Sequence, residues 1–368
     1  SHHALRHATA DEAPGYHSAP GRLAISMDGG ASRCVVLHTW ADFFPDGMWF
    51  YRFRYPVEEE RGLDGSEDLY SPGLARWLLA PGQTVYLVVA GEELSIDPGA
   101  TLAAERQRRT AIEQQAARGD RVGRRLLRAA DQFVCRRPVG DRSLTTIIAG
   151  YPWFADWGRD VLISLPGLLL SAGRLDEARE VLEMCIASLR HGLVPNCFPE
   201  DGECAAFNSV DAALWLFCGV REYLAASGDD AFAAAVYPAL SNALGHLRRG
   251  TDFGIGQDSD GLLLAGDPST QLTWMDARVA GQPVTPRWHK PVEVEALWYA
   301  SLRTMQYLAR RAGDAAAGRD YDAAARRAAT AFRRLFWDPG RGYLADCVTP
   351  DGPDWSLRPN QVLALALP

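Results

Sequence analysis

Lysine is nearly absent from this 368-residue chain, because Lys290 is the one lysine among 38 basic residues. The 46 acidic residues outnumber the basic ones and give a formal net charge of -8. Nucleic acids and anionic membrane surfaces require a basic face on their partner, so this balance argues against both as main partners. The composition also singles out position 290, where a compact ammonium takes the place of the planar guanidinium used everywhere else.

Long apolar runs and paired cysteines are absent as well. No apolar stretch approaches the roughly 18 residues of a membrane span, so we expect a protein that is not embedded in a bilayer. The seven cysteines form no CxxC pair, and Cys197, Cys204 and Cys218 with His191 match no standard zinc spacing. We therefore expect free thiols in a reducing compartment, a cytoplasmic location and no metal site.

The composition changes along the chain and predicts an α+β multidomain protein. Residues 1–98 contain several runs of β-branched and aromatic residues separated by Gly, Pro and Asp, which predicts a β-rich, sandwich-like domain. Residues 99–133 are rich in alanine and charge, which predicts a helical linker, interrupted between Gly119 and Gly123.

The remaining part, residues 134–368, is predicted to be mostly α-helical. Short loops alternate with long loops that bear Trp, Asp and Gly, as expected for antiparallel helix pairs whose long loops emerge on one side. This pattern is typical of an (α/α)6 toroid, which needs twelve helices, and the sequence supplies about half, so we expect an incomplete toroid. The predicted helices cover residues 158–171 (divided at Pro166), 174–189, 208–226, 229–249, 291–312 and 319–336, and a seventh begins near Pro359.

The segment AGYPWFADWGRD, residues 149–160, places aromatic rings beside fixed charges. Aromatic planes next to charges suit a ligand with polar edges and apolar ring faces, which describes a sugar. If a helix begins near Trp157 with Asp156 at its cap, then Asp156, Arg159 and Asp160 point into one pocket, with Trp153 beside them. The alternative is an aromatic staple on a core helix, with the charges on its surface.

A second candidate group lies at the start of the helix predicted over residues 208–226. Asn208 and Asp211 would edge the same pocket. Asp211 equally fits a first-turn carboxylate that favours the helix dipole. The sequence leaves these two interpretations open.

The third group begins with QLTWMDA, residues 271–277, where Trp274 precedes Asp276. A carboxylic acid held against tryptophan has its charged form disfavoured, so its pKa rises and it can act as a general acid near neutral pH. The alternative for Asp276 is an ordinary loop aspartate bonded to backbone amides.

Further charged and aromatic residues follow this loop and lead into the next predicted helix. Arg287 and Lys290 supply cations, Glu293 and Glu295 supply carboxylates, and Trp298 follows. We predict that these residues line the same pocket, with only one of the two glutamates facing it, and take Glu293 as that residue. The alternative is that both are common first-turn glutamates.

Four motifs together carry a resemblance to a known family: GYPWFADWGRD, QLTWMDA, the string TPR…KPVE…ALWY, and RPNQVLALALP. They resemble the C-terminal glucosidase domain of glycogen debranching enzymes, the amylo-α-1,6-glucosidase family, over about residues 100–368. The β-rich start is similar to the end of the N-terminal domain of the bacterial and archaeal forms. The resemblance implies an (α/α)6 barrel that hydrolyses the α-1,6-linked glucose of a trimmed α-glucan branch with inversion, in the cytoplasm and without a cofactor.

Carried over by position, the resemblance implies that Asp276 is the general acid and that Arg159 with Asp160 holds the terminal glucose. It also implies that Trp153, Trp274 and Trp298 are sugar platforms. His289 stands where the family pattern has glycine, and Glu295 stands where it has asparagine. The family's general base is expected beyond residue 368.

Two other functions fit the same residues. A glucoamylase- or trehalase-like hydrolase would use the same toroid on a different linkage. A non-catalytic α-glucan-binding protein would keep the sugar platforms without a base. The sequence does not indicate the oligomeric state, the preferred branch length or a transferase activity.

Overall fold

The computed structural model describes residues 7–8, 15–27, 32–38, 42–44, 46–92, 94–115, 120–151, 154–198 and 205–367. The chain divides into two compact units, Ser1–Asp120 and Arg121–Pro368. The division falls inside the region predicted to be a helical linker. Helix α2 (Pro98–Glu113) belongs to the first unit and α3 (Arg121–Asp131) to the second.

The first unit consists of small antiparallel sheets. The largest has the order β1 (Gly15–Ala19), β2 (Arg22–Met27), β3 (Ser32–His38) and β8 (Leu87–Ala90). Two ribbons accompany it, and they pair β4 (Asp42–Phe44) with β7 (Leu74–Arg76) and β5 (Met48–Arg54) with β6 (Ser66–Ser71). A short helix, α1 (Pro56–Glu60), joins β5 to β6. Strands thus form within the runs of β-branched and aromatic residues, as at Arg22–Met27 and Met48–Arg54.

Several apolar side chains of this unit are exposed. They include Phe50, Leu69, Leu78 and Val89, while Leu23 is buried. A sandwich buries the inner faces of two packed sheets, and for residues 1–98 that arrangement stays a prediction. Helix α2 nevertheless begins as its sequence suggests, because Pro98 occupies the first turn and Asp97 accepts a hydrogen bond from the Ala100 amide at 3.0 Å.

The second unit opens with α3 and a hairpin of β9 (Val134–Val139) and β10 (Arg142–Ile147) and is otherwise mainly helical. All the helices predicted from the sequence are present. They are α4 (Gly158–Leu165), α5 (Leu175–Ala187), α6 (Asp211–Ser227), α7 (Asp230–Arg249), α8 (Val292–Arg311), α9 (Ala315–Phe336) and α10 (Leu363–Ala366), the last preceded by the 3-10 turn η4 (Pro359–Val362).

The helix boundaries have local causes. Pro166 ends α4 and begins a single π-helical turn, η2 (Pro166–Leu170), so the proline divides the predicted helix. Between α6 and α7, Gly228 adopts a left-handed conformation with φ 67°, and the Asp229 side chain then caps α7 at the Phe232 amide. The reversal takes two residues, so α6 and α7 are antiparallel neighbours.

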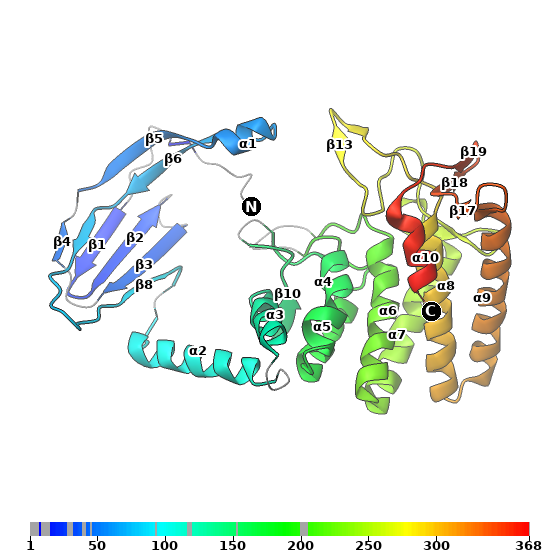
Figure 1. Ribbon diagram of the computed structural model, residues 1–368, viewed down its shortest axis with the longest axis horizontal. Helices are drawn as coiled ribbons and strands as arrows, with labels where there is room; N and C mark the ends of the chain where they lie inside the picture. Colours follow the sequence, from blue (N-terminus) through cyan, green and yellow to red (C-terminus); the bar gives the residue numbers. More distant parts are fainter. Residues whose placement is uncertain are drawn as a thin grey trace. The chain divides into compact units, whose positions relative to one another are not determined.

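Helix α8 lies at the centre of the unit and packs against α6, α7 and α9. It is buried on nearly every side, from Val292 at its start to Ala309 near its end. Figure 1 shows the helices side by side, with the ribbons that carry β13 (Arg278–Val279), β17 (Tyr343–Leu344), β18 (Cys347–Thr349) and β19 (Gly352–Asp354) gathered at one end. Long loops therefore emerge together, as predicted.

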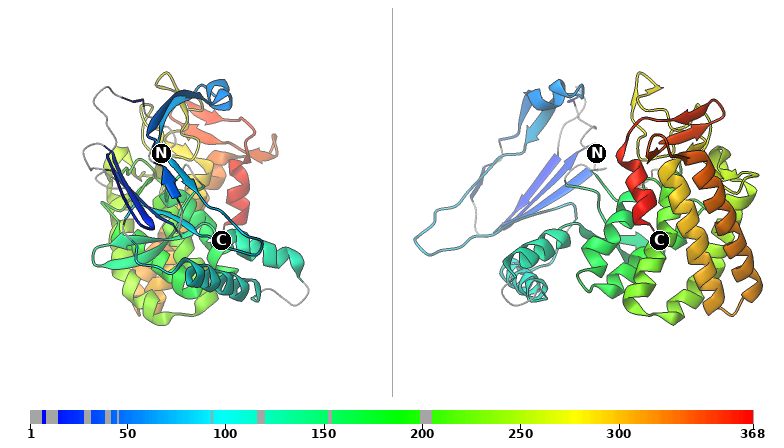
Figure 2. Two further views of the ribbon diagram at one scale, coloured as in Figure 1. Left: turned by 90° about the vertical axis from the view of Figure 1, so that its left-hand side faces the viewer. Right: turned by 45° about the vertical axis from the view of Figure 1, so that its right-hand side comes forward.

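The described helices do not close into a ring. Helix α10 lies against α8 (Figure 2), and the described residues form helix pairs and small sheets with no closed barrel. The fold is accordingly a mixed α and β one. None of the helices in the described ranges combines the length and the apolar character that a bilayer crossing requires.

Candidate functional site

Arg159 is the centre of the candidate site. It lies in the first turn of α4, and its side chain is 11% exposed. Its guanidinium donates to both carboxylate oxygens of Asp211, from Nε at 2.7 Å and from Nη2 at 2.9 Å. Two parallel charge-assisted hydrogen bonds fix the plane of the guanidinium as well as its position.

Asp211 is the first residue of α6 and is itself held in place. Ser209 Oγ donates to Asp211 Oδ1 at 2.6 Å, and Arg159 Nη2 approaches Ser209 Oγ at 3.3 Å. Asp211 is a first-turn carboxylate, and it also joins the Arg159 motif from 52 residues away. Its side chain is buried and paired with Arg159, so it holds Arg159 in place, and its role at the edge of a substrate pocket stays a prediction. Ser209 was not predicted.

Asp276 completes this group from the loop after residue 270. Its Oδ2 lies 3.9 Å from Arg159 Nη1, and its side chain is 40% exposed. Partial burial raises the pKa of Asp276, and the nearby Arg159 charge opposes that rise. The structure therefore brings together two sequence motifs, as predicted, and leaves the Asp276 carboxyl open to a ligand.

Asp160 lies beside Arg159 with its side chain exposed. Partial removal from solvent raises the pKa of Asp160, Arg159 lowers it, and the charges of Asp211 and Asp276 raise it further. Three carboxylates thus share the field of one arginine. A cluster of this kind presents charged acceptors and one donor group to a polar ligand.

Asn208 and Trp274 lie at exposed positions. The Asn208 Oδ1 accepts a weak hydrogen bond from Asn196 Nδ2 at 3.4 Å, and Trp274 is 45% exposed. Trp153, the remaining predicted platform in the first motif, lies outside the described residues.

Asp156 departs from the prediction. Trp157, and not Asp156, occupies the cap position of α4 and makes no side-chain cap. Asp156 is buried and accepts from Arg137 Nε at 2.6 Å and from Thr146 Oγ1 at 2.8 Å. It faces the β9–β10 hairpin, because a buried carboxylate is stable only beside a cation and donors, and Arg137 and Thr146 supply them there.

Four residues that were predicted to contact the substrate are buried: Trp298, Lys290, Arg287 and Glu293. Trp298 is fully buried, and its Nε1 donates to the Gly261 carbonyl at 3.0 Å, so its ring has no free face for a sugar. Lys290 is 4% exposed and donates to Asp258 at 2.6 Å and to Asp260 at 2.9 Å. The compact ammonium predicted at position 290 therefore joins two carboxylates of the chain.

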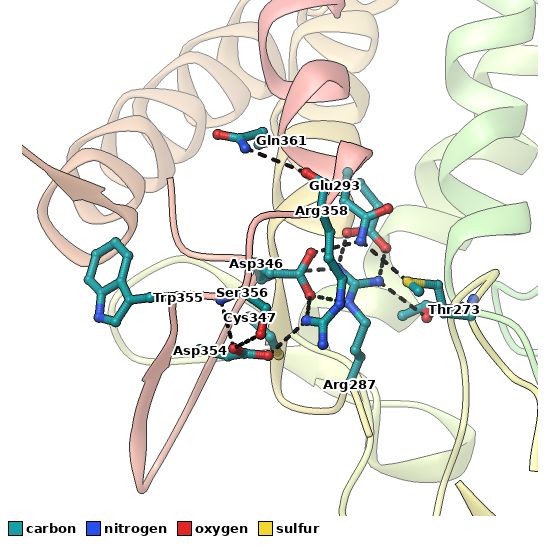
Figure 3. Close-up of polar contacts among 12 residues, drawn as sticks. Thr273, Arg287, Glu293, Asp346, Cys347, Asp354, Trp355, Ser356, Arg358 and Gln361 are labelled. Atoms are coloured by element: carbon teal, nitrogen blue, oxygen red, sulfur yellow. Dashed lines mark hydrogen bonds and ion pairs between the residues drawn. The ribbon is translucent and has the colours of Figure 1, made fainter. Parts of the chain in front are cut away.

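Arg287 and Glu293, the other two, form a buried ion pair. Both are 1% exposed, and the Arg287 guanidinium contacts both Glu293 oxygens. Arg287 Nε also donates to Asp346 Oδ2 at 2.7 Å, and Arg358 Nη1 donates to the same oxygen at 2.7 Å (Figure 3). These residues support the loops around the site and have no surface for a substrate.

The members of this network beyond residue 340 were not predicted as functional. Asp346, Arg358 and Asn360 come from the segment that contains β18, β19 and the RPNQ motif. The presence of RPNQ in the family pattern was the one available signal. No group of three or more His, Cys, Asp or Glu side chains in the described ranges is arranged to hold a metal ion.

Two protein-family profiles match this chain. The sequence profile of the family described as amylo-alpha-1,6-glucosidase matches residues 128–368, and that of the glycogen debranching enzyme N terminal matches residues 1–86. The glycogen debranching enzyme of Saccharomyces cerevisiae is 38% identical over 87 residues, which make up 22% of this chain and 6% of that protein.

Two solved structures are also similar. A GH78 family rhamnosidase of Bacillus sp. GL1 matches with a TM-score of 0.50 and 17% identity, over 99% of this chain and 38% of that one. A rhamnosidase from Klebsiella oxytoca with rhamnose bound matches with a TM-score of 0.47 and 15% identity, over 95% of this chain and 69% of that one. At such identities the first likeness concerns the fold alone.

The profile match covers more than half of the chain and includes every motif of the candidate site. The chain belongs to the amylo-alpha-1,6-glucosidase family. It spans only a small part of the yeast protein and less than half of the Bacillus enzyme.

Proposed function

We propose that this protein is a glycoside hydrolase that releases glucose from α-1,6 branch points of glycogen or limit dextrin by an inverting acid–base mechanism. The observation that carries the proposal is the placement of Asp276, a partly exposed carboxyl with a raised pKa, 3.9 Å from an arginine fixed by Asp211. Membership of the amylo-alpha-1,6-glucosidase family supports the substrate class.

The proposed chemistry assigns one role to each exposed group. Asp276 gives its proton to the leaving glycosidic oxygen, which requires the neutral acid, and partial burial favours that form. Arg159 and Asp160 bind hydroxyls of the terminal glucose, Asn208 lines the edge of the pocket, and the exposed Trp274 ring supports an apolar sugar face. A second carboxylate about 6.5 to 9.5 Å from the acid activates water in an inverting enzyme, and we assign no described residue to that role.

We further propose that the helical part of the chain, residues 134–368, contributes to an (α/α)6 toroid, and that residues 1–98 form a separate β-rich domain joined to it through the helical region 99–133. The free thiols of Cys135, Cys185, Cys218 and Cys347 are consistent with the proposed cytoplasmic location, and the proposed partner is an α-glucan.

The acid role of Asp276 is tested by the substitution Asp276→Asn in the protein at its natural length. Hydrolysis of an ordinary α-glucoside should fall by a factor of about 10² to 10⁴, while a glucosyl fluoride, whose leaving group needs no proton, should lose much less. In the wild-type protein, kcat/KM should fall as the pH rises through the pKa of Asp276. Equal losses on both substrates would remove Asp276 from this role.

The linkage is tested separately. Glucose release from an α-1,6-branched limit dextrin, with none from a linear α-1,4 chain, supports the proposal. The reverse preference would indicate a glucoamylase-like hydrolase, and hydrolysis of trehalose a trehalase-like one. Binding of α-glucan without turnover would indicate a carbohydrate-binding protein.

A further inference from the structure

Asn360 connects the buried ionic network to the loop that carries the proposed acid. It lies in η4 and is 2% exposed. Its Oδ1 accepts a hydrogen bond from Trp274 Nε1 at 2.9 Å, and its Nδ2 donates to Asp346 Oδ1 at 2.7 Å. The Asn360 Nδ2 also lies 3.5 Å from Met275 Sδ.

The charge of Asp346 fixes the orientation of this amide. Asp346 is 2% exposed, and its Oδ2 accepts from two arginines, Arg287 and Arg358. A carboxylate paired with two arginines acts as a hydrogen-bond acceptor. The Asn360 amide must therefore turn its NH₂ group to Asp346, which leaves its oxygen for the Trp274 indole N–H.

The loop around Trp274 is irregular between two backbone hydrogen bonds, from the Val210 amide to the Leu272 carbonyl and from the Val284 amide to the Ala277 carbonyl, both at 3.0 Å. Residues 273–277 form neither helix nor strand. Within it, Thr273 Oγ1 accepts from the Met275 amide at 3.3 Å and from Arg287 Nη1 at 3.4 Å, and both of these bonds are long. The 2.9 Å bond to Asn360 is the shortest of these hydrogen bonds to the segment from Thr273 to Met275. It lies two residues before Asp276.

We propose that Asn360 is a positioning residue, which holds the Trp274 indole and thereby sets the Asp276 carboxyl against Arg159. The kinetic part of this inference rests on the proposed hydrolase function, whereas the hydrogen bond itself is independent of that function. A displacement of about 1 Å at a reacting group costs on the order of 10² in rate, so loss of this anchor should be visible in turnover.

The first test needs no variant at the anchor. The indole N–H signal of Trp274 is identified in a two-dimensional ¹H–¹⁵N spectrum by its absence from Trp274→Phe. Trp274 as a whole is 45% exposed, its Nε1 faces the buried Asn360, and the hydrogen bond to Asn360 predicts exchange with solvent about 10-fold slower than in a free indole. Exchange at the free rate would overturn the inference, whether or not the protein is a hydrolase.

The second test compares neighbouring residues of the same turn. Asn360→Leu removes the anchor at similar side-chain volume, and we expect the Trp274 signal to move, kcat to fall about 10- to 100-fold, and KM to change less. The matched control is Gln361→Leu, because Gln361 accepts from the Leu344 amide at 3.2 Å and its side chain has no hydrogen bond to the 273–276 loop. It should lose comparable thermal stability and keep both kcat and the Trp274 signal.

The outcomes of the two tests are distinguishable. A folded Asn360→Leu protein with an unchanged Trp274 signal contradicts the inference, as do equal losses of kcat in both variants. If Asn360→Leu does not fold, the exchange rate of the wild-type indole still decides. If the wild-type protein hydrolyses no glucoside, the proposed function fails while the exchange measurement continues to test the anchor.

Discussion

Two glutamates in the first turn of α8 differ in their partners, and this contrast gives a sharp prediction. Glu293 and Glu295 are both buried, at 1% and 2% exposure. Glu293 forms an ion pair with Arg287. Glu295 Oε2 accepts from the Leu263 amide at 3.1 Å, and its Oε1 has no hydrogen-bond partner within the described part of the chain.

Burial raises the pKa of Glu295 well above its usual 4.5, opposed by the Leu263 amide and the Lys290 charge, while Asp260 and Asp258 raise it further. A carboxyl whose pKa is higher in the folded state stabilises the fold fully below its unfolded pKa. That contribution is lost as the pH rises toward the folded pKa. The loss amounts to about 1.4 kcal/mol for each pH unit in this window.

The perturbation is Glu295→Gln, which places a neutral amide where the protonated acid lies. Below about pH 4.5 the two proteins should have similar free energies of unfolding. Above it, the variant should gain on the wild type by about 1.4 kcal/mol per pH unit until the folded pKa is reached. The measurement is urea unfolding at half-unit steps from pH 4 to pH 8, with the m-value checked for constancy.

Glu293→Gln is the matched comparison, two residues earlier on the same helix. It leaves the buried Arg287 charge with Asp346 alone, so it should cost about 3 kcal/mol at pH 7. A difference between wild type and Glu295→Gln that stays flat from pH 4 to pH 8 would refute the argument. So would a loss at pH 7 as large as that of Glu293→Gln, because it would mean that Glu295 is charged and paired.

Three further substitutions test separate contacts. Asp160→Asn should weaken glucose binding by about 1.5 to 3 kcal/mol, the value of a lost charge-assisted hydrogen bond; unchanged affinity in calorimetry would place the sugar elsewhere. Arg159→Lys removes the paired contact with Asp211 and should lower kcat/KM about 10- to 100-fold, and wild-type kinetics would show that the fixed guanidinium plane does not matter. Lys290→Arg should destabilise the fold by about 1 to 3 kcal/mol, since the buried space between Asp258 and Asp260 holds a compact ammonium, and an unchanged unfolding midpoint in urea would contradict this.

Local sequence patterns were sufficient to predict the helices. The caps and breakers lie within a few residues of each boundary, as at Pro166 and Gly228. The proximity of Arg159 and Asp276 was also predictable. Arg159 begins a helix and Asp276 lies in a long loop, and the long loops were expected at one end of the helices. The family resemblance added the roles of these residues, and those roles remain proposals.

The burial of individual polar and aromatic side chains could not be predicted from the sequence. Trp298 and Arg287 have residue types common in sugar sites. Only the packing of α8 against α6, α7 and α9 shows that Trp298 faces inward, and only the contacts with Glu293 and Asp346 show that Arg287 is buried. Asp156 was misplaced for a related reason, since its partner Arg137 lies 19 residues earlier on β9. A partner so far away in the chain leaves no local pattern.

The pairing of β15 (Lys290–Pro291) with β18 joins segments that are far apart in the chain. It therefore bears on the order in which contacts form during folding. During synthesis the helices from α4 to α9 need only nearby residues, so they can form as the chain emerges. The contact between Arg287 and Asp346 spans 59 residues, and the Trp274 loop gains its Asn360 anchor 86 residues after it is made. Long-range closures of this kind are the slow steps of folding, and domains generally fold as the chain is made. The nascent protein should therefore have a helical body before the Trp274 loop is anchored, and binding of the proposed α-glucan ligand should begin only when the residues beyond 360 have left the exit tunnel.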